Sequence, residues 1–184
     1  MLKAWLHEDR ELIADMGVFQ LYRVRARSPR TGQYRRLSVL HAGSWVNVVA
    51  LTPDRQVILI RQFRHGTGEF TLEIPGGMVD PDEMPAQAAM RELLEETGYA
   101  GDPPVSIGVV TPNPAILNNR CHTFLIENCR WSREPELDSG EDIEVMTRPL
   151  QDVPGIIAAG DINHALVISA FWWLSQKHPG LLHP

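Results

Sequence analysis

The residues most able to do chemistry in this chain are three glutamates at close spacing, Glu92, Glu95 and Glu96. On a helix, this spacing places all three carboxylates on one face, with neighbouring Cβ atoms about 5–6 Å apart. Glu95 and Glu96 would also lie in the last helical turn, where the macrodipole disfavours anions by about 0.3–1 kcal/mol each. A helix face that repels itself in this way indicates a site where oxygen ligands hold a divalent cation.

The alternative is an exposed acidic helix end, stabilised by pairs between these glutamates and basic residues three or four positions away. Arg91 is the basic residue near them in the sequence, and one guanidinium offsets only part of the repulsion among three carboxylates. We therefore favour the metal site over the solvated helix end.

Two residues mark the limits of the helix that must carry the three glutamates. Pro85 has a fixed φ and no N–H, which suits the first helical position, and Gly98 stands where a helix would stop. The helix between them is predicted to have about three and a half turns. Ala89 and Leu93, four positions apart, are predicted to face the core.

The stretch from Gly77 to Tyr99 reads G-x5-E-x7-R-E-U-x-E-E-x-G-U, where U is an apolar residue. It resembles the box of the Nudix hydrolases. The fixed positions are matched at Gly77, Glu83, Arg91, Glu92, Leu93, Glu95, Glu96 and Gly98. The last position departs from the pattern, because Tyr99 stands where an aliphatic residue is usual; its ring is still mostly apolar.

The resemblance implies a role for each polar position of the box. Glu92, Glu95 and Glu96 would hold Mg²⁺, or Mn²⁺ as a substitute, together with the main-chain carbonyl of Gly76 just before the box. Glu83 and Arg91 would form a buried pair that orients the metal-binding carboxylates, which contributes positioning more than stability. With Glu95, these two are the catalytic residues expected inside the box.

A further catalytic residue is expected in the acidic stretch from Asp138 to Glu144. Nudix relatives often carry two glutamates one residue apart in a mobile loop here, one as general base and one as metal ligand. This chain has Glu141 at one of these positions and Ser139 at the other. Glu141 is therefore expected to act as base, as metal ligand, or as both; the alternative is a solvated run of charges.

Four residues are candidates for binding the substrate. Arg64 matches a phosphate-contacting arginine of the ADP-ribose branch of the family, and a planar guanidinium suits two phosphate oxygens; the alternative is an exposed arginine at a strand end. Arg61 is a weaker candidate for this role. ADP-ribose pyrophosphatases carry a proline sixteen positions beyond the last box glycine, which is Pro114 here. The following loop, with Asn119, would touch the base or the terminal sugar, and its sequence departs from that of these relatives.

The activity implied by the resemblance is Mg²⁺-dependent hydrolysis of the diphosphate in ADP-ribose or a related nucleoside diphosphate sugar. The products would be a nucleoside monophosphate and a sugar phosphate. Hydrolysis of dinucleoside polyphosphates or capped RNA fits the box equally well, but fits Pro114 less well. A regulator that binds a nucleotide sugar without cleaving it is a third alternative, although such a protein would be expected to lack some acidic residues of the box.

Composition excludes several other classes. With 184 residues, 43% of them hydrophobic, the chain is long enough for one domain with a full core. A net charge of −6 argues against a nucleic-acid partner, which needs a basic stripe. The longest apolar run, 165–174, is shorter than the 18 or so residues of a membrane span, and residues 1–12 do not resemble a signal peptide. Cys121 and Cys129 would lie about 26 Å apart along a strand, too far for a disulfide. We expect a soluble cytoplasmic protein with no membrane partner.

The fold class predicted is α/β (α+β), a Nudix-like α/β/α sandwich with a mixed sheet. Strands are expected at 45–51, 56–63, 70–74, 105–111, 121–127 and 143–147, the first two adjacent, and helices at 85–97, 151–159 and 163–177. Alternating residues at 19–26 and 34–40 flank a Pro- and Gly-containing turn, which predicts a β hairpin within an N-terminal extension (1–42) ahead of the main domain (43–184). In ADP-ribose pyrophosphatases such an extension exchanges with a partner subunit, so the resemblance implies a homodimer; alternatively, the hairpin covers its own sheet edge.

Overall fold

The computed structural model describes residues 1–182 and divides them into two compact units. The first unit comprises Met1–Gly43 and Thr111–Arg120, and the second comprises Ser44–Val110 and the residues from Cys121 onwards. Each unit is described by itself. Among the described residues, no helix combines the length and the apolar character needed to cross a membrane.

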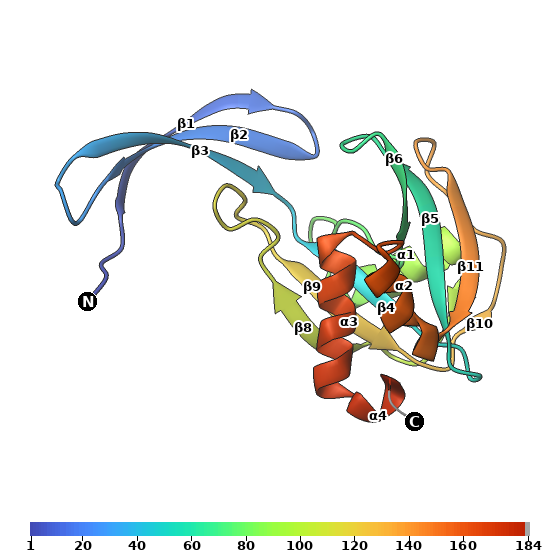
Figure 1. The fold of residues 1–184 in the computed structure, drawn as a ribbon. Coiled ribbons are helices and arrows are strands. Elements are labelled where there is room, and N and C mark those ends of the chain that lie inside the picture. Colours follow the sequence, from blue (N-terminus) through green and yellow to red (C-terminus); the bar gives the residue numbers. More distant parts are fainter. Residues whose placement is uncertain (183–184) are drawn as a thin grey trace. The chain divides into compact units, whose positions relative to one another are not determined.

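The first unit is a three-stranded antiparallel meander, drawn in blue in Figure 1. Its strands are β1 (Leu6–Asp15), β2 (Phe19–Arg27) and β3 (Tyr34–Ala42). The predicted hairpin corresponds to β2 and β3, but the prediction missed β1. Nine of the ten β1 residues are exposed, so this strand has no alternation of apolar and polar residues that would reveal it.

The strands of the second unit form two three-stranded sheets and one short pair. In the first sheet, β4 (Trp45–Ala50) runs parallel to β9 (Cys121–Ile126), which pairs antiparallel with β8 (Val105–Val110). The second sheet has the order β11 (Ile143–Pro149), β5 (Gln56–Arg64), β6 (Glu69–Glu73) and is antiparallel throughout. The short pair joins β7 (Tyr99–Ala100) to β10 (Arg130–Trp131).

The strands predicted at 45–51 and 56–63 both form, but they lie next to each other only at one end. Apart from one bridge between Leu51 and Val57, β4 and β5 have different partners and belong to different sheets. Both strands are apolar enough to be buried, and β9 and β11, which pair with β4 and β5, come from distant parts of the chain. The turn at 52–55 shows that the two strands are consecutive, and it does not decide which strands they pair with.

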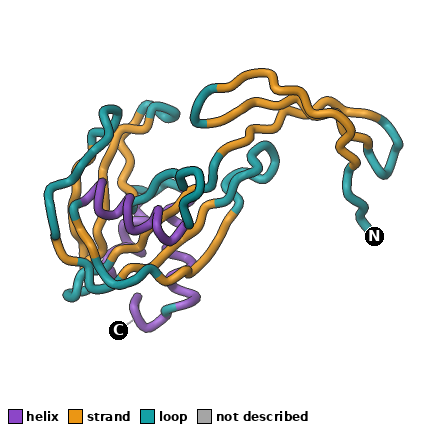
Figure 2. The backbone as a smooth tube through the Cα atoms, turned by 180° about the vertical axis from the view of Figure 1, so that it is seen from behind, coloured by secondary structure: helices purple, strands orange, loops and turns teal. Residues whose placement is uncertain are grey.

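Helices cover both faces of these sheets, which confirms the predicted sandwich (Figures 1 and 2). They are α1 (Pro85–Thr97), the 3₁₀ turn η1 (Leu150–Asp152), α2 (Val153–Ala159), α3 (Ala165–Lys177) and α4 (Pro179–Leu182). The structure adds α4 after His178, where the prediction ended the last helix.

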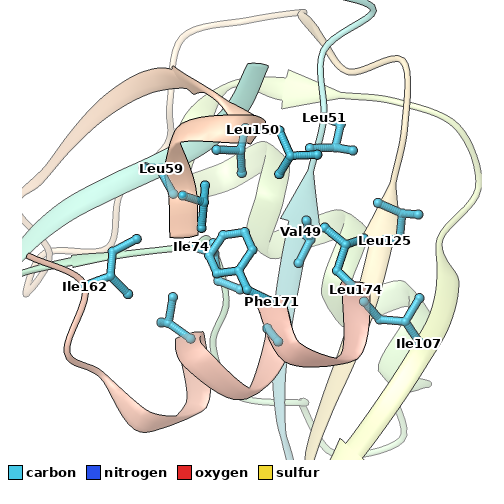
Figure 3. Close-up of a cluster of buried hydrophobic side chains, with 14 residues drawn as sticks. Val49, Leu51, Leu59, Ile74, Ile107, Leu125, Leu150, Ile162, Phe171 and Leu174 are labelled. Carbon is cyan, nitrogen blue, oxygen red and sulfur yellow. The ribbon is translucent and has the colours of Figure 1, made fainter. Parts of the chain in front are cut away.

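Residues of β4 alternate between the two helical layers. Val46 and Val48 are buried in a cluster with Leu93 of α1. Val49 is buried in the opposite cluster, where the ring of Phe171 from α3 lies among apolar side chains (Figure 3). Burial on both faces makes β4 a core strand of the second unit, and α1 packs against one of these faces.

The end of α1 depends on Gly98, which has a φ of 73° and donates its N–H to the Leu94 carbonyl at 2.9 Å. A Cβ at this position would collide with the main-chain oxygen of Arg133.

We expect Gly98→Ala to lower the free energy of unfolding by about 2 kcal/mol or more, measured by urea denaturation. Gly155→Ala is the matched control, because Gly155 lies in α2 with open space around it; this change is expected to stabilise by about 0.5–1 kcal/mol. Equal effects of the two substitutions would contradict this account.

Candidate active site

Helix α1 presents two of the predicted carboxylates to the protein interior. Glu92 is 9% exposed and Glu96 only 3% exposed, whereas the side chain of Glu95 is 37% exposed. Ala89 and Leu93 are buried in the core, as predicted from their spacing. The amphipathic pattern of the helix therefore places ionisable groups where apolar residues would ordinarily pack.

The loop that precedes α1 lies against these buried carboxylates. Gly76 donates its N–H to Glu96 Oε2 at 2.9 Å. A Cβ on Gly77 would collide with the carboxylate of Glu92, so glycine lets the main chain approach that group closely. Met78 O accepts a hydrogen bond from Arg91 Nη2 at 3.0 Å, which ties the loop to the helix.

The guanidinium of Arg91 donates hydrogen bonds to most of the carboxylates of the box. Its Nε and Nη2 donate to the two oxygens of Glu83 at 3.0 and 2.9 Å. Its Nη1 donates to Glu92 Oε1 and to Glu95 Oε2, both at 3.0 Å. One guanidinium therefore faces three carboxylates, and Glu96 is not among its partners.

The buried carboxylates have strongly perturbed protonation equilibria. Desolvation, followed by the charges of Glu92 and Glu141, raises the pKa of Glu96 to about 8, although the N–H of Gly76 and the charge of Arg64 oppose the shift. Desolvation likewise raises the pKa of Glu92 to about 6, against the opposing effect of the adjacent guanidinium. The protein's own cations therefore do not compensate for the burial of these two carboxylates in their ionised form.

The donor set fits a divalent cation, but the donors are not yet arranged around one point. Among residues 1–182, no three His, Cys, Asp or Glu side chains converge closely enough to form a metal site as they stand. Glu92, Glu95 and Glu96 each use one oxygen in the hydrogen bonds above, which leaves the other oxygen of each carboxylate for a ligand. Hard oxygen donors carrying excess negative charge suit Mg²⁺. Binding would require the glutamates held by Arg91 to turn toward the ion.

Glu141 lies in the exposed loop before β11. Its N–H donates to Asp138 O at 2.9 Å, and its Oε2 accepts from Asp138 N at 3.1 Å. Its charge contributes to the raised pKa values of Glu92 and Glu96, so the loop lies within electrostatic range of the buried carboxylates. Ser139, at the other position of the predicted pair, is exposed in the same loop.

The two candidate arginines of β5 have different surroundings. Arg64 donates from Nε and Nη2 to the two oxygens of Glu73, both at 2.7 Å. The hydrogen bonds to Glu73, together with the charges of Glu73, Glu96 and Glu141, raise the pKa of Arg64, so its guanidinium lies within electrostatic range of the buried carboxylate of Glu96. Arg61 lies over the ring of Phe70, 5.0 Å from its centroid, beside a shallow pocket of about 340 Å³.

Glu73 was missed by the sequence analysis, which assigned 70–74 only as a strand. It is 3% exposed, and a buried carboxylate requires a cationic or hydrogen-bonding partner. Glu73 ends β6, in which Glu69, Thr71 and Glu73 alternate with Phe70 and Leu72, so the sequence pattern resembles an ordinary polar strand face and gave no signal of burial. Pairing it with Arg64 requires the β5–β6 register, which a single sequence does not specify.

Pro114 and Asn119 belong to the first unit. Pro114 is exposed in a turn closed by the hydrogen bond from Leu117 N to Asn113 O at 2.7 Å. Asn119 is 4% exposed and donates from Nδ2 to Gly43 O at 3.1 Å. Its Oδ1 is buried with no hydrogen-bond partner among the described residues. The side-chain amide of Asn119 thus ties the loop to the chain at Gly43.

In the absence of divalent metal ions, the free energy of unfolding should decrease as the pH rises. Glu92 and Glu96 have folded-state pKa values of about 6 and about 8 against an ordinary value of 4.5. The folded protein therefore retains protons that the unfolded chain releases, and stability is lost between about pH 4.5 and about pH 8. In EDTA we expect the free energy of unfolding to drop by on the order of 2–4 kcal/mol across this window, measured by urea denaturation. Glu96→Gln should remove most of this slope, and an unchanged slope in this variant would contradict the assignment.

Comparisons with known proteins identify the family of this chain. The NUDIX domain family matches residues 43–171. The chain is 31% identical over 169 residues to "ADP-ribose pyrophosphatase" of Bacillus subtilis (strain 168), covering 91% of each protein. It is 36% identical over 132 residues to "ADP-sugar pyrophosphatase" of Mus musculus, covering 66% of this chain and 60% of that protein.

A solved structure shows the same fold over nearly the whole chain. The crystal structure of an ADP compounds hydrolase superposes with a TM-score of 0.85, covering 98% of this chain and 97% of its own, at 22% identity. The family match spans more than half of the residues, and the Bacillus relative aligns over nearly its full length. The chain therefore belongs to the NUDIX family, as its resemblance to the box predicted, and it is a pyrophosphatase of this family, whose hydrolases generally depend on a divalent metal ion.

Proposed function

We propose that this chain hydrolyses the diphosphate linkage of ADP-ribose or a related nucleoside diphosphate sugar, with Mg²⁺ as its cofactor. The relatives named ADP-ribose pyrophosphatase and ADP-sugar pyrophosphatase support this substrate class. The observation that carries the proposal is the pair of buried carboxylates, Glu92 and Glu96, whose charge the protein itself leaves unbalanced. A substrate that arrives with metal ions supplies the missing positive charge.

Residues of α1 and the loop before it would hold the metal. The ligands proposed are Glu92, Glu95, Glu96 and the carbonyl of Gly76. A divalent ion bound there neutralises charge on the diphosphate, polarises phosphorus and lowers the pKa of a bound water. The pair of Glu83 and Arg91 would hold the loop against the helix and orient the metal-binding carboxylates.

Glu141 and Arg64 would act on the reacting groups directly. Glu141 is exposed on its loop. We assign it the role of general base, which removes a proton from the attacking water, or of an additional metal ligand. Arg64 would contact a phosphate oxygen and stabilise the charge that develops there. Attack of water on one phosphorus breaks its bond to the bridging oxygen, which leaves with the other phosphate. A nucleoside monophosphate and a sugar phosphate result.

A substrate panel tests the proposal most economically. ADP-ribose, GDP-mannose, UDP-glucose and diadenosine polyphosphates would be incubated with Mg²⁺ or Mn²⁺. Phosphate release would be coupled to a phosphatase that attacks only the products. We expect turnover of ADP-ribose or another nucleoside diphosphate sugar. Preferred cleavage of the diadenosine compounds would instead assign a dinucleoside polyphosphate hydrolase, and binding without cleavage would assign a regulator.

We also propose that residues 1–42 form a dimerisation extension to the catalytic domain at 43–184, in a cytoplasmic homodimer. The exposed apolar side chains of Leu6, Leu12 and Leu37 on the first unit's sheet support an interface with a second copy. The cytoplasmic assignment is supported by the free, buried thiols of Cys121 and Cys129, since a reducing compartment keeps thiols free.

Multi-angle light scattering should give the mass of two 20.7 kDa chains. Leu37→Glu should shift that mass toward one chain, and a monomeric wild type would contradict the proposal.

A further inference from the structure

We propose that Glu73 is a positioning residue that holds the guanidinium of Arg64 on the catalytic side of β5, with Nη1 presented to a substrate phosphate. The inference rests on the function proposed above, and it adds to it a residue outside the box. Glu73 acts through Arg64 and is not itself expected to touch the substrate.

The strand register shows that the side chain of Arg64 runs back along the sheet from the end of β5. In the β5–β6 ladder, Arg64 stands opposite Glu69, and Glu73 stands opposite Ile60. The side chain of Arg64 nevertheless bonds to Glu73, past the intervening position of Thr71. The guanidinium therefore lies along the sheet face and does not extend from the strand end into solvent.

The carboxylate that holds it is itself fixed. Glu73 is 3% exposed, and its Oε1 accepts a hydrogen bond from the Thr71 hydroxyl in addition to the one from Arg64. Desolvation works to raise the pKa of Glu73, but the hydrogen bonds from Arg64 and Thr71 outweigh it, and the net pKa is lowered. Glu73 therefore stays ionised as a rigid anchor.

The arrangement determines which donors remain for a ligand. Nε and one N–H of Nη2 donate to Glu73, which leaves both N–H groups of Nη1 and the second N–H of Nη2 without a partner among the described residues. The guanidinium side chain remains 43% exposed, so a ligand can reach it. Because Glu73 already balances the charge of Arg64, the pair offers a ligand N–H donors of fixed orientation more than it adds positive charge.

A fixed donor lowers the cost of reaching the transition state, because an unanchored arginine must be ordered during the reaction. We expect Glu73→Gln to lower kcat/KM for ADP-ribose about tenfold or more, with most of the loss in kcat. Glu73→Asp should recover part of it if the shorter carboxylate still accepts from Arg64. Glu69→Gln is the matched control, because Glu69 is exposed on the same strand and its side chain makes no hydrogen bond or ion pair among the described residues; it should leave both constants unchanged.

A double-mutant cycle separates positioning from a merely structural role. In an Arg64→Ala background, Glu73→Gln should cause no further loss of kcat/KM, because its effect passes through the missing arginine. The same second substitution should raise the melting temperature of Arg64→Ala, since it removes a buried carboxylate left without its cation. An equal loss of activity in both backgrounds would overturn the proposal.

An independent measurement does not require turnover. In ¹⁵N-edited NMR spectra of the wild-type protein without substrate, the Arg64 Nε–H signal should be resolved and slow to exchange with water. Glu73→Gln should broaden or abolish it, whereas Glu69→Gln should not. An unchanged Arg64 signal in Glu73→Gln would overturn the positioning role. If the wild type cleaves no compound of the panel, the proposed function fails, while this spectrum still decides whether Glu73 anchors Arg64.

Discussion

Glu96→Gln is expected to lower kcat for ADP-ribose about a thousandfold while leaving the fold intact. A metal ligand contributes several kcal/mol of transition-state stabilisation, and each 1.36 kcal/mol or so corresponds to a factor of ten in rate. The glutamine retains an oxygen that can accept the hydrogen bond from Gly76, now made to Glu96 Oε2 at 2.9 Å. The substitution therefore removes the charge of the ligand and changes the local packing little.

The measurement is the steady-state rate at saturating Mg²⁺, with folding checked by circular dichroism. Glu134→Gln is the matched control, because Glu134 is an exposed glutamate of the same unit and its loss should leave the rate unchanged. Turnover of Glu96→Gln near the wild-type rate at saturating Mg²⁺ would show that this carboxylate is not a required ligand.

Arg91→Ala is expected to affect both activity and stability. The substitution leaves Glu83, Glu92 and Glu95 without the guanidinium that they share. The side chains of Arg91 and Glu83 are 28% and 16% exposed, so the network is intermediate between surface pairs and buried pairs. We expect a loss of about 2–4 kcal/mol in the free energy of unfolding and about a hundredfold loss in kcat/KM.

Arg91→Lys separates charge from geometry in this network. Lysine keeps one positive charge but cannot donate to three carboxylates from a planar fork, so its defects should be intermediate. Added Mg²⁺ should restore part of the stability of Arg91→Ala, because the ion balances the same carboxylates. Unfolding by urea with and without Mg²⁺ measures this. An Arg91→Ala protein as stable and as active as the wild type would refute the role of Arg91 as the shared cation.

The limits of α1 could be predicted because they depend on local residues. Pro85 fits the first turn of any helix, and Gly98 adopts a left-handed conformation that other residues avoid. The grouping of Glu92, Glu95 and Glu96 then follows from helical geometry alone. Their burial and the resulting pKa shifts do not, because these depend on how β4 and the loop at Gly76 pack against the helix.

Features that depend on distant pairing were harder to predict. The strand β1 is exposed along nearly its whole length, so its sequence carries no apolar alternation. The pairings of β4 with β9 and of β5 with β11 join strands separated by long stretches of chain, and the short turn at 52–55 carries no information about them. The contact between Glu73 and Arg64 is closer in sequence, because β5 and β6 are consecutive strands, but it could be predicted only once the register of their ladder was known.

The most direct test of the central claim is a product analysis of ADP-ribose incubated with the wild-type protein in Mg²⁺ and, in parallel, in EDTA. Ion-exchange chromatography would separate and quantify the products. If the unbalanced carboxylates of α1 act by holding a divalent cation, AMP and ribose 5-phosphate should appear in equal amounts with Mg²⁺ and be absent with EDTA. Equal turnover in EDTA would contradict the account, and so would a protein that with Mg²⁺ leaves ADP-ribose and every nucleoside diphosphate sugar of the panel intact.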